Sequence, residues 1–178
     1  MEIRPCSAQD LARLQAGWPI PGSDIHAAHF AAQQTGSAAY LVAWRGGLPV
    51  GSGMVQWGGC VGPHARSAHP GCIEFNHLQV RPEERGSGVG SALIAAAEDL
   101  IRWRGHPEVG IGVAADNPAA AALYRRLGYE LTGVRDTIAY TWFDGDGAAH
   151  DEIEHDELLV KALRDQRRTS PTSGPQVG

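Results

Sequence analysis

The residues best placed to do chemistry lie in a glycine-rich turn at positions 85–90, RGSGVG. Three glycines in five residues let the backbone turn sharply and present successive N–H groups to a ligand. Residues 91–104 place apolar side chains at helical spacing, so the positive end of a helix dipole is expected to point at this turn. The apolar, β-favouring residues 71–80 predict a strand before it. A strand, a glycine turn and a helix N-terminus together predict an anion site, most naturally for phosphate.

The spacing of the glycines narrows the choice of phosphate ligand. A dinucleotide-binding turn follows G-x-G-x-x-G, and a P-loop ends in G-K-[ST]. Here the spacing is G-x-G-x-G and no lysine follows. The turn fits R-x-x-G-x-G instead, and residues 78–82, LQVRP, precede it as L-x-V-x-P. Downstream, residues 117–129, NPAAAALYRRLGY, fit N-x-x-A-x-x-L-Y-x-x-x-G-[FY].

In this order and spacing the segments resemble the acyl-CoA-binding signatures of the GNAT superfamily of N-acetyltransferases. The resemblance implies an α/β fold of mixed α+β type, with a central, mostly antiparallel twisted sheet of about seven strands and helices on both faces. It also implies that two neighbouring strands splay apart and that the pantetheine arm of the coenzyme lies between them. One domain is expected over residues 1–165, and the tail 166–178 is expected to be disordered because it has almost no apolar content.

The same resemblance implies acetyl-CoA as co-substrate. Backbone amides near the end of the central strand are expected to bind the thioester and pantetheine, and those of the turn the pyrophosphate, with charge added by the arginine. The residues expected at the coenzyme are Leu78, Gln79, Val80, Arg85, Gly86, Ser87, Gly88, Val89, Gly90, Ser91, Asn117 and Tyr124. Without the resemblance, Arg85 reads equally well as a solvated turn residue.

Two of these positions also bear on catalysis by acetyl transfer to an amine. The resemblance makes Tyr124 the general acid for the leaving thiolate and Glu74 the general base. His77 is the alternative base, because the ordinary pKa of a histidine suits proton transfer near neutral pH. Glu74 could equally serve a structural hydrogen bond or salt bridge, since its environment cannot be read from sequence. Members that acetylate peptide N-termini carry a base five residues before the motif asparagine, and here that residue is Gly112, which argues against their mechanism.

The acceptor amine is not fixed by any motif. An acidic segment could attract a cationic amine, polyamine or aminoglycoside, although charge runs are more often solvated. Its residues are Asp144, Asp146, Asp151, Glu152, Glu154, Asp156 and Glu157. Two other functions stay open: a catalytically degenerate, CoA-binding regulatory domain, and a nucleotide-binding module that uses the same turn.

Composition sets the remaining limits. The chain has 178 residues, 43% hydrophobic and 20% charged, as one globular core requires, and its net charge of −5 argues against nucleic-acid binding. No apolar run is long enough for a membrane span and no signal segment is evident, so a cytoplasmic location is expected. Cys60, His64, His69 and Cys72 invite a zinc hypothesis, but C-x₃-H-x₄-H-x₂-C lacks a paired half-site, and no metal is predicted. An exposed strand at the end of the sheet would permit a homodimer.

The hydrophobic pattern predicts the element order β-α-α-β-β-β-α-β-α-β-β. Ser7 and Asp10 predict a capping box, and Gly46-Gly47 a hairpin turn. Residues 58–71 are expected to form a loop, residues 144–147 a turn, and residues 157–163 the last strand.

Overall fold

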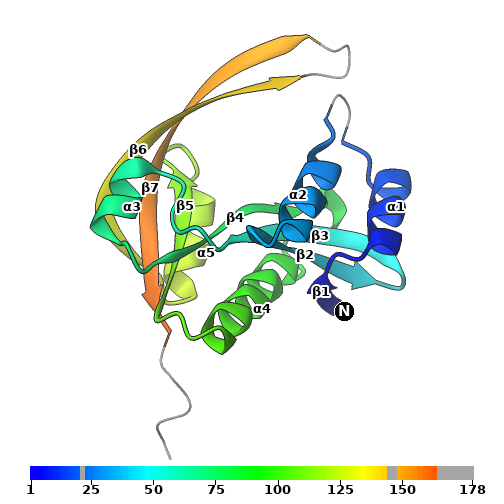
Figure 1. Ribbon diagram of the computed structural model, residues 1–178, viewed down its shortest axis with the longest axis horizontal. Coiled ribbons are helices and arrows are strands. Elements are labelled where there is room, and N and C mark those ends of the chain that lie inside the picture. The colour runs from blue at the N-terminus through cyan, green and yellow to red at the C-terminus, as the bar shows by residue number, and fades with distance from the viewer. Residues whose placement is uncertain (21–22, 144–147, 164–178) are drawn as a thin grey trace, which may run out of the picture.

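The computed structural model describes residues 1–20, 23–143 and 148–163, and these form a seven-stranded sheet with helices on both faces (Figure 1). The sheet order is β1-β2-β3-β4-β5-β7-β6. The predicted mixed fold and element order are confirmed, with two short helices added, whereas the expected turn at 144–147 and the tail 166–178 lie outside the described residues. The elements are β1 (Glu2–Pro5), α1 (Ala8–Gly17), α2 (Ile25–Gln34), β2 (Ala38–Arg45), β3 (Leu48–Gln56), α3 (Pro63–Ala68), β4 (Ile73–Val80), the 3₁₀ turn η1 (Pro82–Glu84), α4 (Val89–Trp103), β5 (Glu108–Ala114), α5 (Pro118–Arg126), β6 (Glu130–Phe143) and β7 (Ala149–Ala162).

Strands β4 and β5 form the parallel pair of an otherwise antiparallel sheet, and they pair over two residues only. Ile73 lies opposite Val109 and Glu74 opposite Gly110. Beyond that point β4 stays paired with β3, and β5 stays paired with β7. The two strands therefore separate after Glu74 and leave a V-shaped opening in the sheet, which agrees with the predicted splay.

A bulge in β4 sets which amides face this opening. The register between β3 and β4 shifts between Ser52 and Met54, and His77, inside the bulge, has φ of 50°. The Arg81 N–H donates to the Val50 carbonyl on β3 at 3.1 Å. Because successive amides of a strand point to opposite sides, the N–H groups of Val80 and Leu78 face the opening.

The helices divide between the two faces of the sheet. The largest buried cluster packs α4 and α5 on one face, through residues such as Phe75, Leu93 and Tyr124. On the other face α1 and α2 cover a second cluster that contains Tyr40 and Met54. A third, small cluster, Cys60, Ala65, Cys72 and Leu158, lies beneath α3. Within the described part of the chain, no helix is long and apolar enough to span a membrane.

Several local signals act as predicted. Ser7 and Asp10 form the capping box of α1. Gly46 and Gly47 have φ of 58° and 79° in the β2–β3 turn, which favours glycine at both positions. Gly128, with φ of 90°, follows the end of α5.

Two predicted boundaries are wrong. The expected loop at 58–71 contains α3, because Asp136 of β6 accepts the N–H groups of His64 and Ala65 and so caps a helix too short to form alone. The last strand begins at Ala149 rather than at Glu157. Its polar first half pairs with residues 136–143 of β6, in a part of the hairpin that extends well past the helices (Figure 1). Pairing with β6, rather than an apolar pattern in its own residues, marks this half as strand.

Candidate active site at the β4–β5 opening

The glycine turn presents unbonded amides at the N-terminus of α4. Gly86 and Gly88 have φ of 77° and 87°, and Gly88 is the residue that precedes the helix. The N–H groups of the first helical turn, Val89 to Ser91, have no acceptor within a helix, and the first to find one is Ala92, which donates to Gly88. Ser87 differs, since its N–H donates to the Glu84 carbonyl inside the turn. The turn therefore presents several unbonded amides and the N-terminus of a helix, an arrangement that suits an anion.

Packing fixes this turn against the end of β4. The Val89 side chain is buried directly over Gly51, where a Cβ would come within 2.8 Å of Val89 Cγ1. A Cβ at Gly90 would lie 3.7 Å from Val80 and 3.9 Å from Leu78. An anion bound at the turn would thus lie next to the end of β4, where the Leu78 and Val80 amides face the opening. Arg85 is exposed, and its Nε lies 3.4 Å from the Val80 carbonyl oxygen.

Glu74 stands where the opening begins. Its carboxylate, in a residue only 7% exposed, accepts the Val61 N–H at 2.8 Å and the Asn76 side-chain amide at 3.1 Å. Burial raises the pKa of Glu74 above its ordinary value, and the two hydrogen bonds only partly oppose this effect. A carboxylate with a raised pKa is suited to exchange protons nearer to neutral pH.

Tyr124 reaches the same region from α5. It is buried, and burial together with the nearby Asp156 carboxylate raises its pKa, so its hydroxyl stays protonated at neutral pH. No hydrogen bond joins this hydroxyl to another described residue. Asn117, two helical turns earlier, is exposed, and its side-chain oxygen caps α5 by accepting the Ala120 N–H at 3.0 Å.

Sequence reasoning did not single out Asp156 from its acidic segment. The side chain lies over Gly112 of β5, with Oδ2 3.3 Å from the place that a Cβ would occupy there. It is near enough to Glu74 and Tyr124 to raise the pKa of both. Alternate residues of the acidic segment face opposite sides of the sheet. Which of them lie on the same side as Gly112 therefore depends on the pairing register of β5 with β7, which the sequence does not show.

The histidines near the opening have other partners. His77 packs against His29 with ring centroids 4.7 Å apart and ring planes tilted by 47°. Burial lowers the pKa of His77, although the residue keeps substantial exposure. His26 is buried and joins the Tyr40 hydroxyl at 2.7 Å and the Trp18 carbonyl at 2.8 Å, so it is a structural residue of the α2 layer.

The four residues of the zinc hypothesis separate into two groups. Cys60 and Cys72 are fully buried beside Gly110. His64 and His69 turn instead to Asp136 and Glu108, at 3.0 and 3.2 Å. No group of three or more ligand-type side chains suited to a metal occurs among the described residues.

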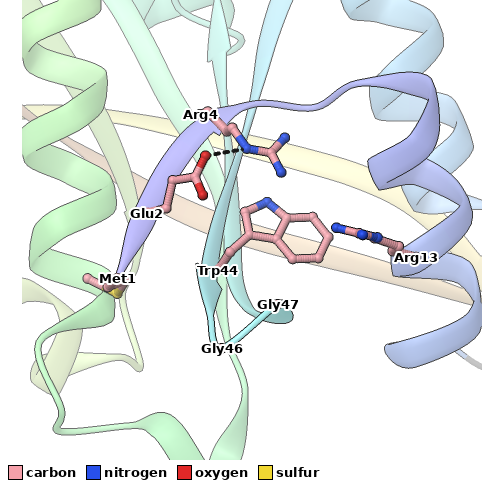
Figure 2. A pocket seen from close by; sticks show the side chains of 7 residues that line it. All are labelled: Met1, Glu2, Arg4, Arg13, Trp44, Gly46 and Gly47. Carbon is pink, nitrogen blue, oxygen red and sulfur yellow. Dashed lines mark hydrogen bonds and ion pairs between the residues drawn. The ribbon is translucent and has the colours of Figure 1, made fainter.

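A surface hollow also lies away from this opening. One is lined by Met1, Glu2, Arg4, Arg13, Trp44, Gly46 and Gly47 at the β1 edge of the sheet (Figure 2). Figure 2 shows the Arg4 guanidinium above the Trp44 ring and the Arg13 guanidinium beyond the edge of that ring, with Glu2 bonded to Arg4. Neither the glycine turn nor Glu74 contributes to it, so it is separate from the site at the opening.

The split parallel pair, with the glycine turn and a helix N-terminus at the end of β4, is the arrangement that the resemblance to the GNAT superfamily implies. Residues 7–129 match the family model described as the acetyltransferase (GNAT) family, and the chain belongs to that family. A 77-residue stretch, 43% of the chain, is 44% identical to mycothiol acetyltransferase of Clavibacter sepedonicus and spans about a quarter of that protein.

Solved structures share the fold. An N-acetyltransferase from Staphylococcus aureus Mu50 is 19% identical, with a TM-score of 0.65 over 92% of this chain and 98% of that one. A phosphinothricin acetyltransferase from Sinorhizobium meliloti, solved in complex with AcCoA, is 23% identical, with a TM-score of 0.63 over 97% of this chain and 94% of that one.

Proposed function

We propose that the protein transfers the acetyl group of acetyl-CoA to a primary amine of a small molecule or peptide by direct attack on the thioester. The observation that carries the proposal is the separation of β4 and β5 after Glu74, with the glycine turn packed against the other end of β4. It allows one extended ligand to place a diphosphate at the turn and a thioester in the opening.

The backbone supplies binding and polarisation. Amides of residues 86–91 hold the pyrophosphate, with the exception of Ser87, whose N–H is used within the turn. The N–H groups of Leu78 and Val80 donate to the thioester carbonyl and the pantetheine. Such fixed donors stabilise the negative charge that develops on the carbonyl oxygen during attack.

Glu74 and Tyr124 divide the proton transfers. The unprotonated amine nitrogen attacks the carbonyl carbon and forms the N–C bond, and Glu74 takes the proton that this nitrogen then loses. The C–S bond breaks and the Tyr124 hydroxyl protonates the departing thiolate. The proton on Glu74 then returns the Tyr124 phenolate to its hydroxyl form through solvent, which completes the cycle.

The test is CoA release, followed with a thiol reagent, from acetyl-CoA and a panel of polyamines, aminoglycosides, amino acids and short peptides. Acetyl-CoA should raise Tm, and at least one amine should release CoA with formation of its N-acetyl derivative. Binding of acetyl-CoA with no release across the panel would favour a degenerate CoA-binding domain. A Tm shift with NAD or ATP but not with acetyl-CoA would reject the proposal.

A further inference from the structure

Three carboxylates near the start of the opening, on β4, β6 and β7, differ in how well they are bonded. Glu74 on β4 accepts two protein N–H groups. Asp136 on β6 accepts the N–H groups of His64 and Ala65 and contacts the His64 ring. Asp156 lies directly opposite Asp136 in the β6–β7 pairing, and no hydrogen bond or ion pair joins its carboxylate to any described side chain.

The position of Asp156 is set by a missing side chain on β5. Its carboxylate group lies against the backbone of Gly112, with Oδ2 3.3 Å and Cγ 3.8 Å from the ideal Cβ position. Gly110, two residues earlier on the same side of β5, pairs with Glu74. Strands β5 and β7 run side by side here (Figure 1), so Asp156 and Glu74 lie on one side of the sheet at the start of the opening.

The charge around Asp156 is negative. Its pKa is raised by burial and by the carboxylates of Glu154 and Asp136, and it in turn raises the pKa of Glu74 and of Tyr124. The two charged groups that act on its pKa, Glu154 of β7 and Asp136 of β6, are both acids. A carboxylate held among acids without a cation of its own is complementary to a positively charged ligand.

We propose that Asp156 is the acceptor-binding carboxylate of the transfer site and that it takes the acceptor as a primary ammonium ion. This inference rests on the proposed function. An alkyl amine is almost entirely protonated at neutral pH, so it arrives as the cation. Asp156 orients this ammonium beside Glu74, one proton leaves to solvent, and the nitrogen then attacks as described above. Anionic acceptors, such as small acids with a single amino group close to the carboxylate, are disfavoured by the same field.

A pair of coenzyme thioethers tests the assignment without knowledge of the natural acceptor. S-(2-aminoethyl)-CoA ends in a primary ammonium group close to where the nitrogen of the acceptor would attack. S-(2-hydroxyethyl)-CoA has a chain of the same length that ends in a neutral hydroxyl group. Calorimetry should give the ammonium compound the lower Kd on the unmodified protein, by at least about tenfold, as expected for a hydrogen bond between charged groups. Asp156→Asn should reduce this preference to roughly twofold or less while leaving the Kd of the hydroxyl compound unchanged.

Glu157→Gln is the matched control, since it removes one negative charge from the adjacent residue of β7, whose side chain is 3.4 Å from Arg135 instead. The Glu157→Gln variant should still bind the ammonium compound more tightly than the hydroxyl compound. Absence of the preference in the unmodified protein, or its survival in Asp156→Asn, would overturn the inference while leaving acetyl transfer intact. Failure of both thioethers and of CoA itself to bind would overturn the proposed function as well.

Discussion

Replacing Glu74 with glutamine keeps the volume of the side chain but changes its hydrogen bonding. The carboxylate accepts from two donors, the Val61 N–H and the Asn76 amide. A glutamine has one oxygen to accept with, so its NH₂ group must face the other donor. An unsatisfied buried group costs about 1–3 kcal/mol. At about 2–4 °C per kcal/mol for a chain of this length, Tm should fall by roughly 2–12 °C.

The pH dependence of this loss has a definite sign. A carboxyl group whose pKa is raised on folding binds its proton more tightly in the folded state, so its contribution to stability falls as pH rises from the ordinary value of 4.5 through the folded pKa. The Glu74→Gln variant lacks this pH-dependent contribution to stability, because glutamine does not titrate. The stability deficit of the variant, measured by urea unfolding at several pH values, should therefore be largest below pH 4.5 and should narrow as the pH rises towards neutrality.

The catalytic consequence should be much larger than the structural one. Loss of a general base lowers kcat by about 10²–10⁴-fold. The assay is CoA release at saturating acetyl-CoA, with an amine that the unmodified protein turns over, on protein whose folded fraction and acetyl-CoA Kd have been checked. Glu98→Gln is the control, because Glu98 is also 7% exposed but pairs with Lys161 away from the opening. A folded Glu74→Gln variant with kcat within about threefold of the unmodified protein would refute the role of the base.

Three further changes test separate parts of the account. Tyr124→Phe should lower kcat by about 10²-fold or more and leave the acetyl-CoA KM nearly unchanged, and an unchanged kcat would exclude a general-acid role. Gly88→Ala places a side chain at φ of 87° and should raise the acetyl-CoA Kd roughly tenfold by calorimetry, whereas Gly58→Ala, which has open space and no such φ, should not. Asp10, whose pKa the Arg4 hydrogen bond lowers to about 2, stabilises the fold above pH 3.8; Asp10→Asn should cost about 1–2 kcal/mol at pH 7, and this deficit should vanish as pH falls through about 2. A deficit for Asp10→Asn that is independent of pH would contradict this reasoning.

Local sequence signals predicted much of the frame because they act over a few residues. The capping box at Ser7, the Gly46-Gly47 turn and the glycine turn before α4 each encode a backbone conformation in their own residue types. The apolar periodicity of α4 likewise defines the helix that places the turn amides.

The site could be predicted less completely, because its chemistry depends on contacts between distant segments. Helix α3 exists because Asp136, more than 70 residues away, caps it. The environment of Glu74 depends on the Val61 amide in the preceding loop. Asp156 reaches the opening only because Gly112 lacks a side chain on the neighbouring strand. None of these relations is a local pattern, so sequence spacing alone could name Glu74 but could neither establish its burial nor select Asp156.

The most direct test of the central claim is a crystal structure of the protein with acetyl-CoA. The account predicts the diphosphate within hydrogen-bond distance of the amides at the start of α4, and the thioester carbonyl between β4 and β5, next to the amides of Leu78 and Val80 and within reach of Tyr124. A coenzyme bound in the hollow at the β1 edge, or a thioester directed away from the opening, would contradict it.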